Sequence, residues 1–316
     1  MSQALWHINA SQSELREVEF TQRNSTKDLL LSRYSLISLG TERTVASGCC
    51  DNRFLGEMSV PYMEGCFELP VKYGYSLIGA KAAEPAQFFH LMHPHQSQCL
   101  VDEKALTPIP KKLPVDRACL ISNMETVINA IWDARLSENS RVLILGFGAI
   151  GSLLATTLKL QYDLEFEVWD LDDWKQMKIQ AMGLKLWNNK GNFDCVFHTT
   201  ASQQGLQQAI DVCGIEGKVV ELSWYGNKKI QLNLGDSFHY GRKSIISSQV
   251  SLIPGHMQAE YDYAKRKSLA IKYLIHPTYD ELISHKIPFS DSPQFFKKLR
   301  KSATGPGLNW LIDYHS

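Results

Sequence analysis

The spacing of apolar residues changes twice along the 316-residue chain. Up to about residue 113, apolar residues alternate with polar ones or form short runs that end at glycine. Both patterns are typical of β-strands, and they predict strands within residues 14–20, 32–40 and 72–80. Prolines at positions 108, 110 and 114 exclude a regular helix from the segment that contains them.

A second pattern begins with helical spacing at residues 116–136 and continues as an alternation of strands and helices. The alternation predicts strands at residues 141–145, 165–170, 193–199, 217–224 and 243–250, and helices at residues 151–160, 173–182 and 203–213. Strands separated by helices of this length predict a parallel sheet that is covered on both faces.

The pattern changes again after about residue 255. We expect a surface helix at residues 260–275, a strand and turn at 281–291, a helix at 292–301 and a last strand at 307–314. The simplest organisation is a continuous α/β domain at residues 119–256, inserted between two pieces of a mixed, β-rich domain at residues 1–118 and 257–316.

Charge and composition narrow the class of protein. The chain has 33 basic and 33 acidic residues and no long basic tract, which argues against a nucleic-acid partner. It has neither a signal-peptide pattern nor the roughly 20 successive apolar residues that span a bilayer, so we expect a cytoplasmic protein without a membrane partner. Seven irregularly spaced cysteines, with no C-x-x-C motif, argue against a disulfide framework and a four-cysteine zinc lobe.

A glycine-rich turn follows the first strand of the alternation. Gly146, Gly148 and Gly151 fit the pattern G-x-G-x-x-G between an apolar strand and an apolar helix. The first glycine permits the tight turn, the second lets the backbone approach a pyrophosphate, and the third lets the helix pack close to the strand. The N–H groups at the start of the helix, around Ala149 and Ile150, would bind the anion. The turn therefore predicts a dinucleotide site.

An acidic residue stands where such a site needs one, about 20 residues after the turn and at the end of the second strand. Asp170 would accept hydrogen bonds from both ribose hydroxyls, and its charge would repel a 2′-phosphate, so we favour NAD over NADP. Lys175 keeps NADP open as the less favoured cofactor. Two alternatives remain: Asp170 simply begins a turn, or the turn and the acid belong to a methyltransferase.

Several motifs in this order resemble the medium-chain dehydrogenase/reductase superfamily, and most of all its bacteriochlorophyllide dehydrogenase-like branch. The motifs include "SLISLGTER", "GYSLIGA", "NMETVINAIWDA", "LGFGAIG" and "LISHKIPFSD", and the resemblance covers nearly the whole chain. It implies an α/β fold in which a Rossmann domain, a doubly wound parallel sheet, is inserted in a GroES-like, mixed β-rich catalytic domain. It also implies a small-molecule substrate in the cleft between the domains, and a homodimer.

The chain departs from the zinc-dependent members of that superfamily at three positions. Those members take ligands from a cysteine before G-[ST]-D, from the histidine of G-H-E, and from a cysteine or glutamate in the helix that leads to the Rossmann fold. The corresponding positions here hold Ser38 and Leu39, then Tyr75, then Ser122 and Asn123. Neutral hydroxyls and an amide are poor zinc ligands, so we expect no zinc.

Another hydrogen-bonding group would have to replace the metal in polarising the substrate. Tyr75 is the leading candidate because a phenol both donates and accepts, although a tyrosine that only packs would fit the same position. The resemblance places Thr41 near the reacting oxygen, where a turn-capping role is equally compatible. It places Glu42 where the superfamily has an acid, which could instead pair with Arg43 or another cation.

The histidines of "HLMHPHQ" and several strand ends complete the candidate residues. The resemblance places His93 on a loop that lines the substrate pocket, where a histidine could relay a proton, while a metal site and an ordinary surface loop are the alternatives. It also implies cofactor contacts, each equally compatible with ordinary packing, at Thr126, Thr199, Thr200, Ser223 and Ser248.

Taken together, these features favour a zinc-independent, NAD(H)-dependent oxidoreductase that moves a hydride between the nicotinamide and an alcohol or carbonyl. A zinc-free enoyl or quinone reductase is one alternative, because hydride transfer to a conjugated carbon needs no metal. A catalytically silent NAD(P)-binding sensor is the other.

Overall fold

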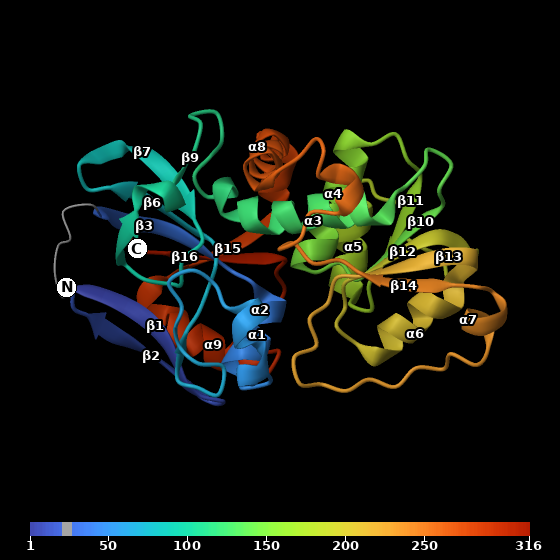
Figure 1. The fold of residues 1–316 in the computed structure, drawn as a ribbon, viewed down its shortest axis with the longest axis horizontal. Helices are drawn as coiled ribbons and strands as arrows, with labels where there is room; N and C mark the ends of the chain where they lie inside the picture. Colours follow the sequence, from blue (N-terminus) through green and yellow to red (C-terminus); the bar gives the residue numbers. More distant parts are fainter. Residues whose placement is uncertain (21–26) are drawn as a thin grey trace. The chain divides into compact units, whose positions relative to one another are not determined.

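The computed structural model describes residues 1–20 and 27–316. Their contacts divide the chain into two compact units (Figure 1). Unit 1 comprises Met1–Ser122, Gly226–Lys228 and Leu274–Ser316, and unit 2 comprises Asn123–Tyr225 and Lys229–Tyr273. The chain therefore leaves the first unit, builds most of the second and returns, as the sequence pattern predicts.

Unit 1 contains two β-sheets and three α-helices among its described residues. The larger sheet has the strand order β15-β16-β3-β6-β7-β9, with β8 also paired to β3. Its strands are β3 (Lys27–Ile37), β6 (Leu77–Lys81), β7 (Glu84–Leu91), β8 (Gln98–Asp102), β9 (Thr107–Pro108), β15 (Ile283–Pro288) and β16 (Asn309–Asp313). The smaller sheet, in the order β2-β1-β5-β4, contains β1 (Ser2–Asn9), β2 (Gln12–Val18), β4 (Glu64–Gly65) and β5 (Val71–Lys72).

The helices of unit 1 are α1 (Leu39–Ala46), α2 (Leu55–Met58) and α9 (Ser292–Arg300). Helix α9 lays one apolar face, with Phe295, Phe296 and Leu299, on a core that includes Leu5 and Ile312. The core thus joins residues from both ends of the chain, and this packing holds the C-terminal piece in the first unit.

Unit 2 is built around a five-stranded sheet in the order β11-β10-β12-β13-β14, and every strand pair is parallel. Its strands are β10 (Val142–Leu145), β11 (Phe166–Trp169), β12 (Phe193–His198), β13 (Cys213–Glu221) and β14 (Ser244–Ser247). Its helices are α3 (Ile121–Ala134, beginning just inside unit 1), α4 (Ala149–Gln161), α5 (Asp173–Ala181), α6 (Gln203–Val212), α7 (Ser237–Tyr240) and α8 (Tyr263–Leu274). This is the doubly wound arrangement that the alternation predicts.

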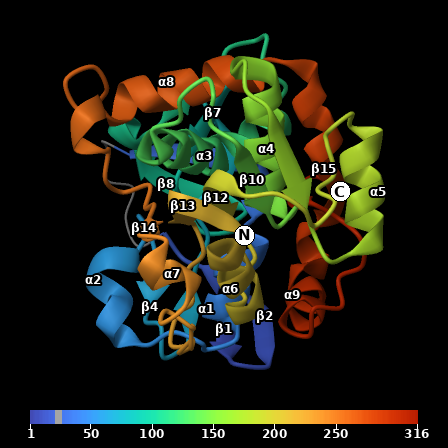
Figure 2. The ribbon, with the colours of Figure 1, turned by 90° about the vertical axis from the view of Figure 1, so that its right-hand side faces the viewer.

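Helices cover both faces of the parallel sheet. Leu206 and Ile210 of α6 pack on Leu143 and Leu145 of β10, which point to one face because they are two residues apart. Figures 1 and 2 both show α4 on the opposite side of the sheet from α6. The central strand β10 is consequently apolar, and all four of its residues are buried.

The limits of unit 2 differ from the predicted range of 119–256. The unit begins at Asn123 and extends through α8 to Tyr273. The physical reason for the later end is a buried cation: Arg266 of α8 donates to Asn129 Oδ1 at 2.8 Å and to the Val250 carbonyl at 2.7 Å, both within unit 2. The sequence pattern of α8 shows only a surface helix.

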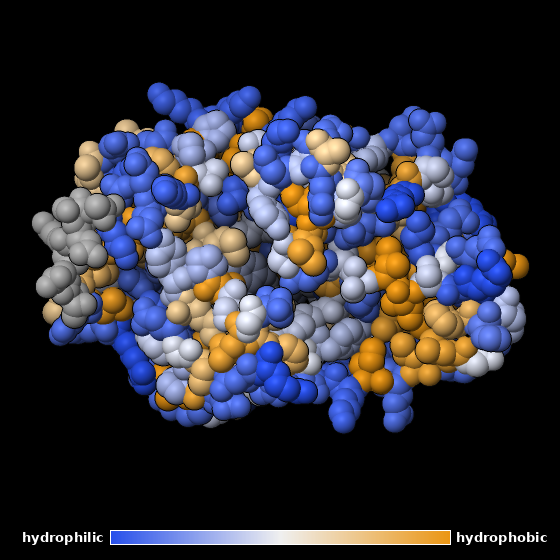
Figure 3. Space-filling view, in the orientation of Figure 1, coloured by the Kyte–Doolittle hydropathy of each residue, from blue (hydrophilic) through white to orange (hydrophobic). Residues whose placement is uncertain are grey.

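Hydrophilic and apolar side chains are unevenly distributed over the surface. Most side chains on the face drawn in Figure 3 are hydrophilic, with apolar side chains gathered in patches. Within the described part of the chain, no helix combines the length and apolarity that crossing a bilayer would require.

Candidate functional site

The glycine-rich turn of unit 2 joins β10 to α4, as predicted. Gly146 has a φ of +105°, a conformation that side chains with a Cβ rarely adopt. At Gly151 a Cβ would lie 1.9 Å from the Gly146 carbonyl oxygen, so the helix approaches the turn too closely for any other residue. At Gly148 a Cβ would meet nothing within 4 Å. Gly146 and Gly151 thus close the turn, and the backbone at Gly148 leaves open space.

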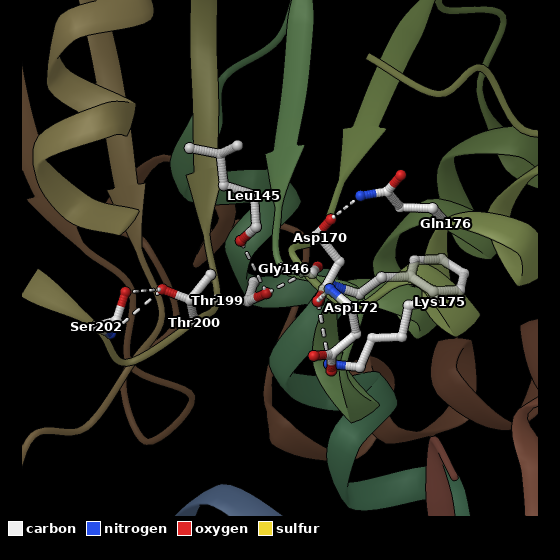
Figure 4. A network of polar contacts seen from close by, with 10 residues as sticks. Leu145, Gly146, Asp170, Asp172, Lys175, Gln176, Thr199, Thr200 and Ser202 are labelled. Atoms are coloured by element: carbon white, nitrogen blue, oxygen red, sulfur yellow. Dashed lines mark hydrogen bonds and ion pairs between the residues drawn. The ribbon is translucent and has the colours of Figure 1, made fainter. Parts of the chain in front are cut away.

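The Asp170 carboxylate lies against this turn (Figure 4). Its Oδ2 accepts from the Phe147 N–H at 2.7 Å, and its Oδ1 accepts from the Asp172 N–H at 3.1 Å. The Lys175 ammonium lies 3.2 Å from both carboxylate oxygens and 2.8 Å from the Asp172 carboxylate. The acid therefore ties the end of β11 to the glycine turn, and Lys175 is the cation of its hydrogen-bond shell.

These residues fit a dinucleotide. The space above Gly148 is a cradle that a Cβ would fill, and it lies at the start of α4, where N–H groups without helical partners attract an anion. The Asp170 carboxylate lies beside the same turn. Its two oxygens can accept hydrogen bonds from a sugar hydroxyl if the Lys175 ammonium moves away from them. Whether the carboxylate holds both ribose hydroxyls stays a prediction.

The ends of β12 and β13 supply the next group of predicted residues. The Thr199 hydroxyl donates to the carbonyls of Leu145 at 3.2 Å and Gly146 at 3.1 Å, so it fixes the glycine turn from the other side. Ser223 Oγ accepts from the Ala201 N–H at 3.0 Å. Unit 2 thus brings together the turn, Asp170, Thr199, Thr200 and Ser223 at the carboxyl ends of neighbouring parallel strands.

Two other predicted cofactor residues lie within polar contacts of their own. The Ser248 hydroxyl donates to Asp133 Oδ2 of α3 at 2.7 Å. Thr126 is half-buried on the same helix. Glu125 lies 3.4 Å from the Arg266 guanidinium and is buried, which raises its pKa. Glu125 therefore belongs to the buried contacts of Arg266 that hold α8 in unit 2.

Unit 1 gathers the residues at the three positions of the lost zinc ligands. The Tyr75 hydroxyl donates to Ser38 Oγ and is also hydrogen-bonded to Thr41. Burial raises the pKa of Tyr75 to about 12, although these hydrogen bonds act in the opposite direction. The Ser122 hydroxyl donates to the Tyr75 carbonyl at 3.0 Å. Tyr75 is therefore a protonated donor at physiological pH, held by serine and threonine hydroxyls.

Glu42 lies fully buried behind this group. Its Oε1 accepts from the Ser38 N–H at 2.8 Å, and its Oε2 lies 2.7 Å from Nε2 of the fully buried His95. His95 Nδ1 in turn lies 2.7 Å from Ser35 Oγ. The side chain that pairs with Glu42 is thus His95, while Arg43 contacts Ser302 instead.

His93 is also buried, so the loop "HLMHPHQ" is not an exposed surface loop. Its Nδ1 lies 2.8 Å from the Pro94 carbonyl, and its ring stacks on Tyr62 at a centroid distance of 4.9 Å. Burial lowers the pKa of His93 to about 3. An imidazole with so low a pKa takes up a proton poorly at physiological pH, so His93 is a poor proton relay.

The residues of unit 1 do not fit a zinc ion. A structural or catalytic zinc takes thiolate, imidazole or carboxylate ligands, whereas Leu39, Tyr75 and Ser122 supply a methyl group, a phenol and an alcohol. Across residues 1–20 and 27–316, no three histidine, cysteine, aspartate or glutamate side chains gather as ligands of one ion.

Sequence reasoning missed one pair of site residues, His198 and Glu221. His198 Nδ1 lies 2.7 Å from Glu221 Oε2, and the two residues are register partners at the ends of β12 and β13. The available signal was a histidine and a glutamate that each close an apolar strand, in "FDCVFH" and "GKVVE".

Comparisons with known proteins agree with this architecture. No family model matches the chain. A curated relative, the (R,R)-butanediol dehydrogenase of Saccharomyces cerevisiae, is 23% identical over 123 residues. That match covers 38% of this chain and only 32% of the yeast protein, so it spans about a third of the relative's length.

Solved structures match over the whole chain. A putative zinc-binding dehydrogenase from Clostridium scindens has a TM-score of 0.77 at 14% identity and covers 100% of both chains. An alcohol dehydrogenase from Escherichia coli, in complex with NADH, has a TM-score of 0.74 at 14% identity and covers 99% of both. A putative zinc-binding dehydrogenase from Sinorhizobium meliloti, bound to NADP, gives 0.74 at 15% and again 99% of both. The chain therefore has the fold of the alcohol dehydrogenase-type, medium-chain dehydrogenase/reductase proteins, a Rossmann unit inserted in a GroES-like unit.

Proposed function

We propose that the protein is an NAD(H)-dependent oxidoreductase that moves a hydride between the nicotinamide ring and an alcohol or carbonyl, without a catalytic zinc. The observation that carries the proposal is the turn of unit 2, where Gly148 leaves open space at the start of α4 and Asp170 stands beside it. The dehydrogenase folds that match the chain support the same conclusion.

The chain's own residues divide the work of binding. The N–H groups at the start of α4 bind the pyrophosphate through their partial positive charge. Asp170 accepts from the adenosine ribose, and Lys175 turns from the carboxylate toward the ribose oxygens. A 2′-phosphate beside the ribose would meet the carboxylates of Asp170 and Asp172, which already share the Lys175 ammonium, so NAD is favoured over NADP.

Tyr75 takes the place of the metal as hydrogen-bond donor. A phenol whose pKa is raised to about 12 keeps its proton at neutral pH, and it can donate a hydrogen bond to a carbonyl oxygen that gains negative charge. To do so, the Tyr75 hydroxyl exchanges Ser38 Oγ for the substrate oxygen, while Thr41 keeps the ring in place. When bound, the nicotinamide supplies or accepts the hydride.

Cofactor binding is the first experiment. NADH and NADPH are titrated into the protein while the fluorescence of its seven tryptophans is recorded. We expect saturable binding with NADH at least tenfold tighter than NADPH. Failure to bind either one at millimolar concentration contradicts the proposal, and tighter NADPH binding contradicts only the role of Asp170.

A substitution of Asp170 tests whether this acid determines the cofactor preference. Asp170→Ser removes the acceptor and its charge, so we expect the preference for NADH to fall about tenfold or more. Lys159→Ser, at the exposed C-terminal end of α4, is the matched control, because its ammonium donates to the carbonyls of Met182 and Gly183, away from the glycine turn. An unchanged preference in Asp170→Ser would remove Asp170 from the cofactor site.

Turnover is the second experiment. A panel of secondary alcohols and polyols with NAD, and of ketones with NADH, is screened by absorbance at 340 nm, with metal analysis of the same sample. We expect turnover without stoichiometric zinc, and at least a tenfold loss in Tyr75→Phe with cofactor affinity unchanged. Stoichiometric zinc would contradict the metal-free assignment, and a Tyr75→Phe variant as active as the wild type would contradict the role of Tyr75.

A further inference from the structure

Two neighbouring strands of unit 2 end in ionisable residues at the same level. His198 closes β12 and Glu221 closes β13, and they are register partners in the parallel ladder. His198 is fully buried, and the Glu221 side chain is 11% exposed. Their side chains meet at 2.7 Å, between His198 Nδ1 and Glu221 Oε2.

The partners of Glu221 determine where the histidine carries its proton. Glu221 Oε1 accepts from the Ser223 N–H at 2.7 Å, and Oε2 accepts from the Tyr225 hydroxyl at 3.0 Å. Both contacts use Glu221 oxygens as acceptors, an arrangement that suits a His198 Nδ1–H donating to Oε2. In a neutral imidazole Nε2 then carries a lone pair.

That lone pair faces a hydroxyl. Thr200 Oγ1 lies 2.6 Å from His198 Nε2, and in the tautomer with the proton on Nδ1 the Thr200 hydroxyl is the donor of this hydrogen bond. Thr200 is exposed, whereas His198 is buried. The hydrogen bonds therefore run inward from the Thr200 hydroxyl through the His198 imidazole to the Glu221 carboxylate. This is the geometry by which an imidazole withdraws a proton from a hydroxyl.

The exposed end of this chain lies next to the proposed cofactor turn. The neighbouring Thr199 binds the Gly146 carbonyl, and Figure 4 shows Gly146 between Thr200 and Asp170. Asp170 ends β11, on one side of β10, and Thr200 follows β12, on the other side. If Asp170 marks the adenosine half of a dinucleotide, Thr200 stands on the nicotinamide half, where hydride transfer takes place.

We propose that Thr200 is the proton-transfer residue of the reaction, with His198 and Glu221 as its positioning residues; this rests on the proposed function. In alcohol oxidation the substrate C–H bond breaks, and hydrogen leaves with its electron pair for the nicotinamide ring. The substrate O–H proton passes to Thr200 Oγ1 as the Thr200 proton passes to His198 Nε2. The products are a carbonyl, reduced cofactor and an imidazolium beside the Glu221 carboxylate, and carbonyl reduction runs in reverse.

A purely structural role must be distinguished from this one. Thr200 Oγ1 also lies 3.0 Å from Ser202 Oγ and accepts from the Ser202 N–H at 3.2 Å, contacts that would shape the turn before α6 in any case. The substrate hydroxyl would replace the Ser202 hydroxyl as donor to Thr200. The test therefore needs readouts that a turn-shaping threonine would not change.

The first readout uses the protein without cofactor or substrate. Nitrogen NMR of the histidine rings, with the signals of His198 assigned by their loss in His198→Gln, reports which ring nitrogen carries the proton. We expect a protonated Nδ1 and an unprotonated Nε2 at pH 7.5, with Nε2 alone shifted in Thr200→Val. A protonated Nε2 would overturn the proposal, because Thr200 could not then donate, whatever the activity of the enzyme.

The second readout is turnover of the alcohol that the wild-type protein oxidises best. We expect Thr200→Val to lower kcat about 100-fold or more, the usual range for a lost acid–base group, with NADH affinity within about twofold. Thr200→Ser is expected to recover most of the activity and a solvent deuterium isotope effect. Thr304→Val, the same change in the loop before β16, is the matched control.

The outcomes separate the two levels of the argument. A wild-type protein that binds no dinucleotide overturns the proposed function and, with it, the role of Thr200. A wild-type protein that turns over while Thr200→Val equals Thr304→Val overturns this inference alone. Loss of activity in Thr200→Val that Thr200→Ser does not recover also counts against proton transfer, since serine keeps the hydroxyl.

Discussion

Gly151 and Gly148 of the glycine turn differ in what an added Cβ atom would meet. A Cβ on Gly151 would collide with the Gly146 carbonyl oxygen at 1.9 Å, so this glycine is needed for the fold of unit 2. A Cβ on Gly148 would touch nothing within 4 Å, and the residue has an ordinary φ of −86°. The described fold would therefore accept a side chain at this position. We infer that glycine is needed there because a ligand occupies the space.

A pair of alanine variants tests this division. We expect Gly148→Ala to leave the melting temperature within about 2 °C of the wild type and to weaken NADH binding about tenfold, near 1.4 kcal/mol, because the methyl group occupies the pyrophosphate space. We expect Gly151→Ala to lower the melting temperature by several degrees. Thermal unfolding and NADH titration measure both. Equal affinities in Gly148→Ala and the wild type would remove the pyrophosphate from this turn.

The buried His93 makes stability depend on pH. Its pKa is about 3 in the folded chain, against the ordinary 6.5 of an exposed histidine. Below pH 6.5 the unfolded chain binds a proton that the folded chain excludes, so stability falls as the pH falls from 6.5 toward 3. Between pH 7 and pH 5 this single group costs about 2 kcal/mol.

Urea unfolding at these two pH values measures the effect. We expect His93→Gln to lose about 2 kcal/mol less than the wild type on going from pH 7 to pH 5. His256→Gln is the matched control, because the His256 side chain is exposed. If both variants lose as much stability as the wild type, then His93 titrates normally in the folded chain.

At the scale of elements, α8 shows how a buried charge assigns a helix to a unit. Arg266 is 4% exposed and bonds to Asn129 of α3 and to the Val250 carbonyl, with Glu125 3.4 Å away. A charge removed from water this far must be compensated at every donor. Helix α8 consequently stays with unit 2, although its exposed residues read as an ordinary surface helix.

Removing that cation tests the anchor. We expect Arg266→Met to destabilise unit 2 by about 3 kcal/mol, because the buried Glu125 loses its hydrogen-bonded cation and keeps only the charge of Lys267 nearby. The double variant with Glu125→Gln should recover part of the loss, since no buried charge remains. Lys265→Met is the control on the exposed face of the same helix. Urea unfolding gives the three values, and an Arg266→Met variant as stable as the control would contradict the anchor.

At the scale of the whole molecule, a dinucleotide ligand should act on one unit first. Binding stabilises the folded state by about 2.7 kcal/mol at a ligand concentration of 100 times Kd. The proposed contacts all lie in unit 2, at the β10–α4 turn and the end of β11. The β1–β2 pair of unit 1 provides an internal reference.

Hydrogen exchange with and without saturating NADH measures where this stabilisation falls. We expect slower exchange at residues 146–155 and 168–172, with β1 and β2 changed least. Protection confined to unit 1 would contradict a dinucleotide site at the glycine turn. Light scattering of the same sample tests the homodimer that we propose from the family resemblance.

The sequence alone determined the elements and their order. The helical and alternating patterns correctly predicted α3 to α6, α9 and the strands of the parallel sheet, because periodicity and turn residues act over a few neighbours. The glycine turn and Asp170 were also predicted, since strand, turn and helix are contiguous there. Helix α1 was missed: its residues, "LGTERTVA", carry little apolar periodicity and are held instead by tertiary contacts such as the Glu42–His95 pair.

The tertiary structure decided which distant side chains meet. Glu42 and His95 lie 53 residues apart in the chain, and His198 and Glu221 lie 23 apart, yet each pair is separated by 2.7 Å. Strand register brought the second pair together, and no local pattern encodes register between strands joined by a helix. Periodicity records which face of an element is buried; only the packed fold determines what each buried group touches and therefore what chemistry it can do.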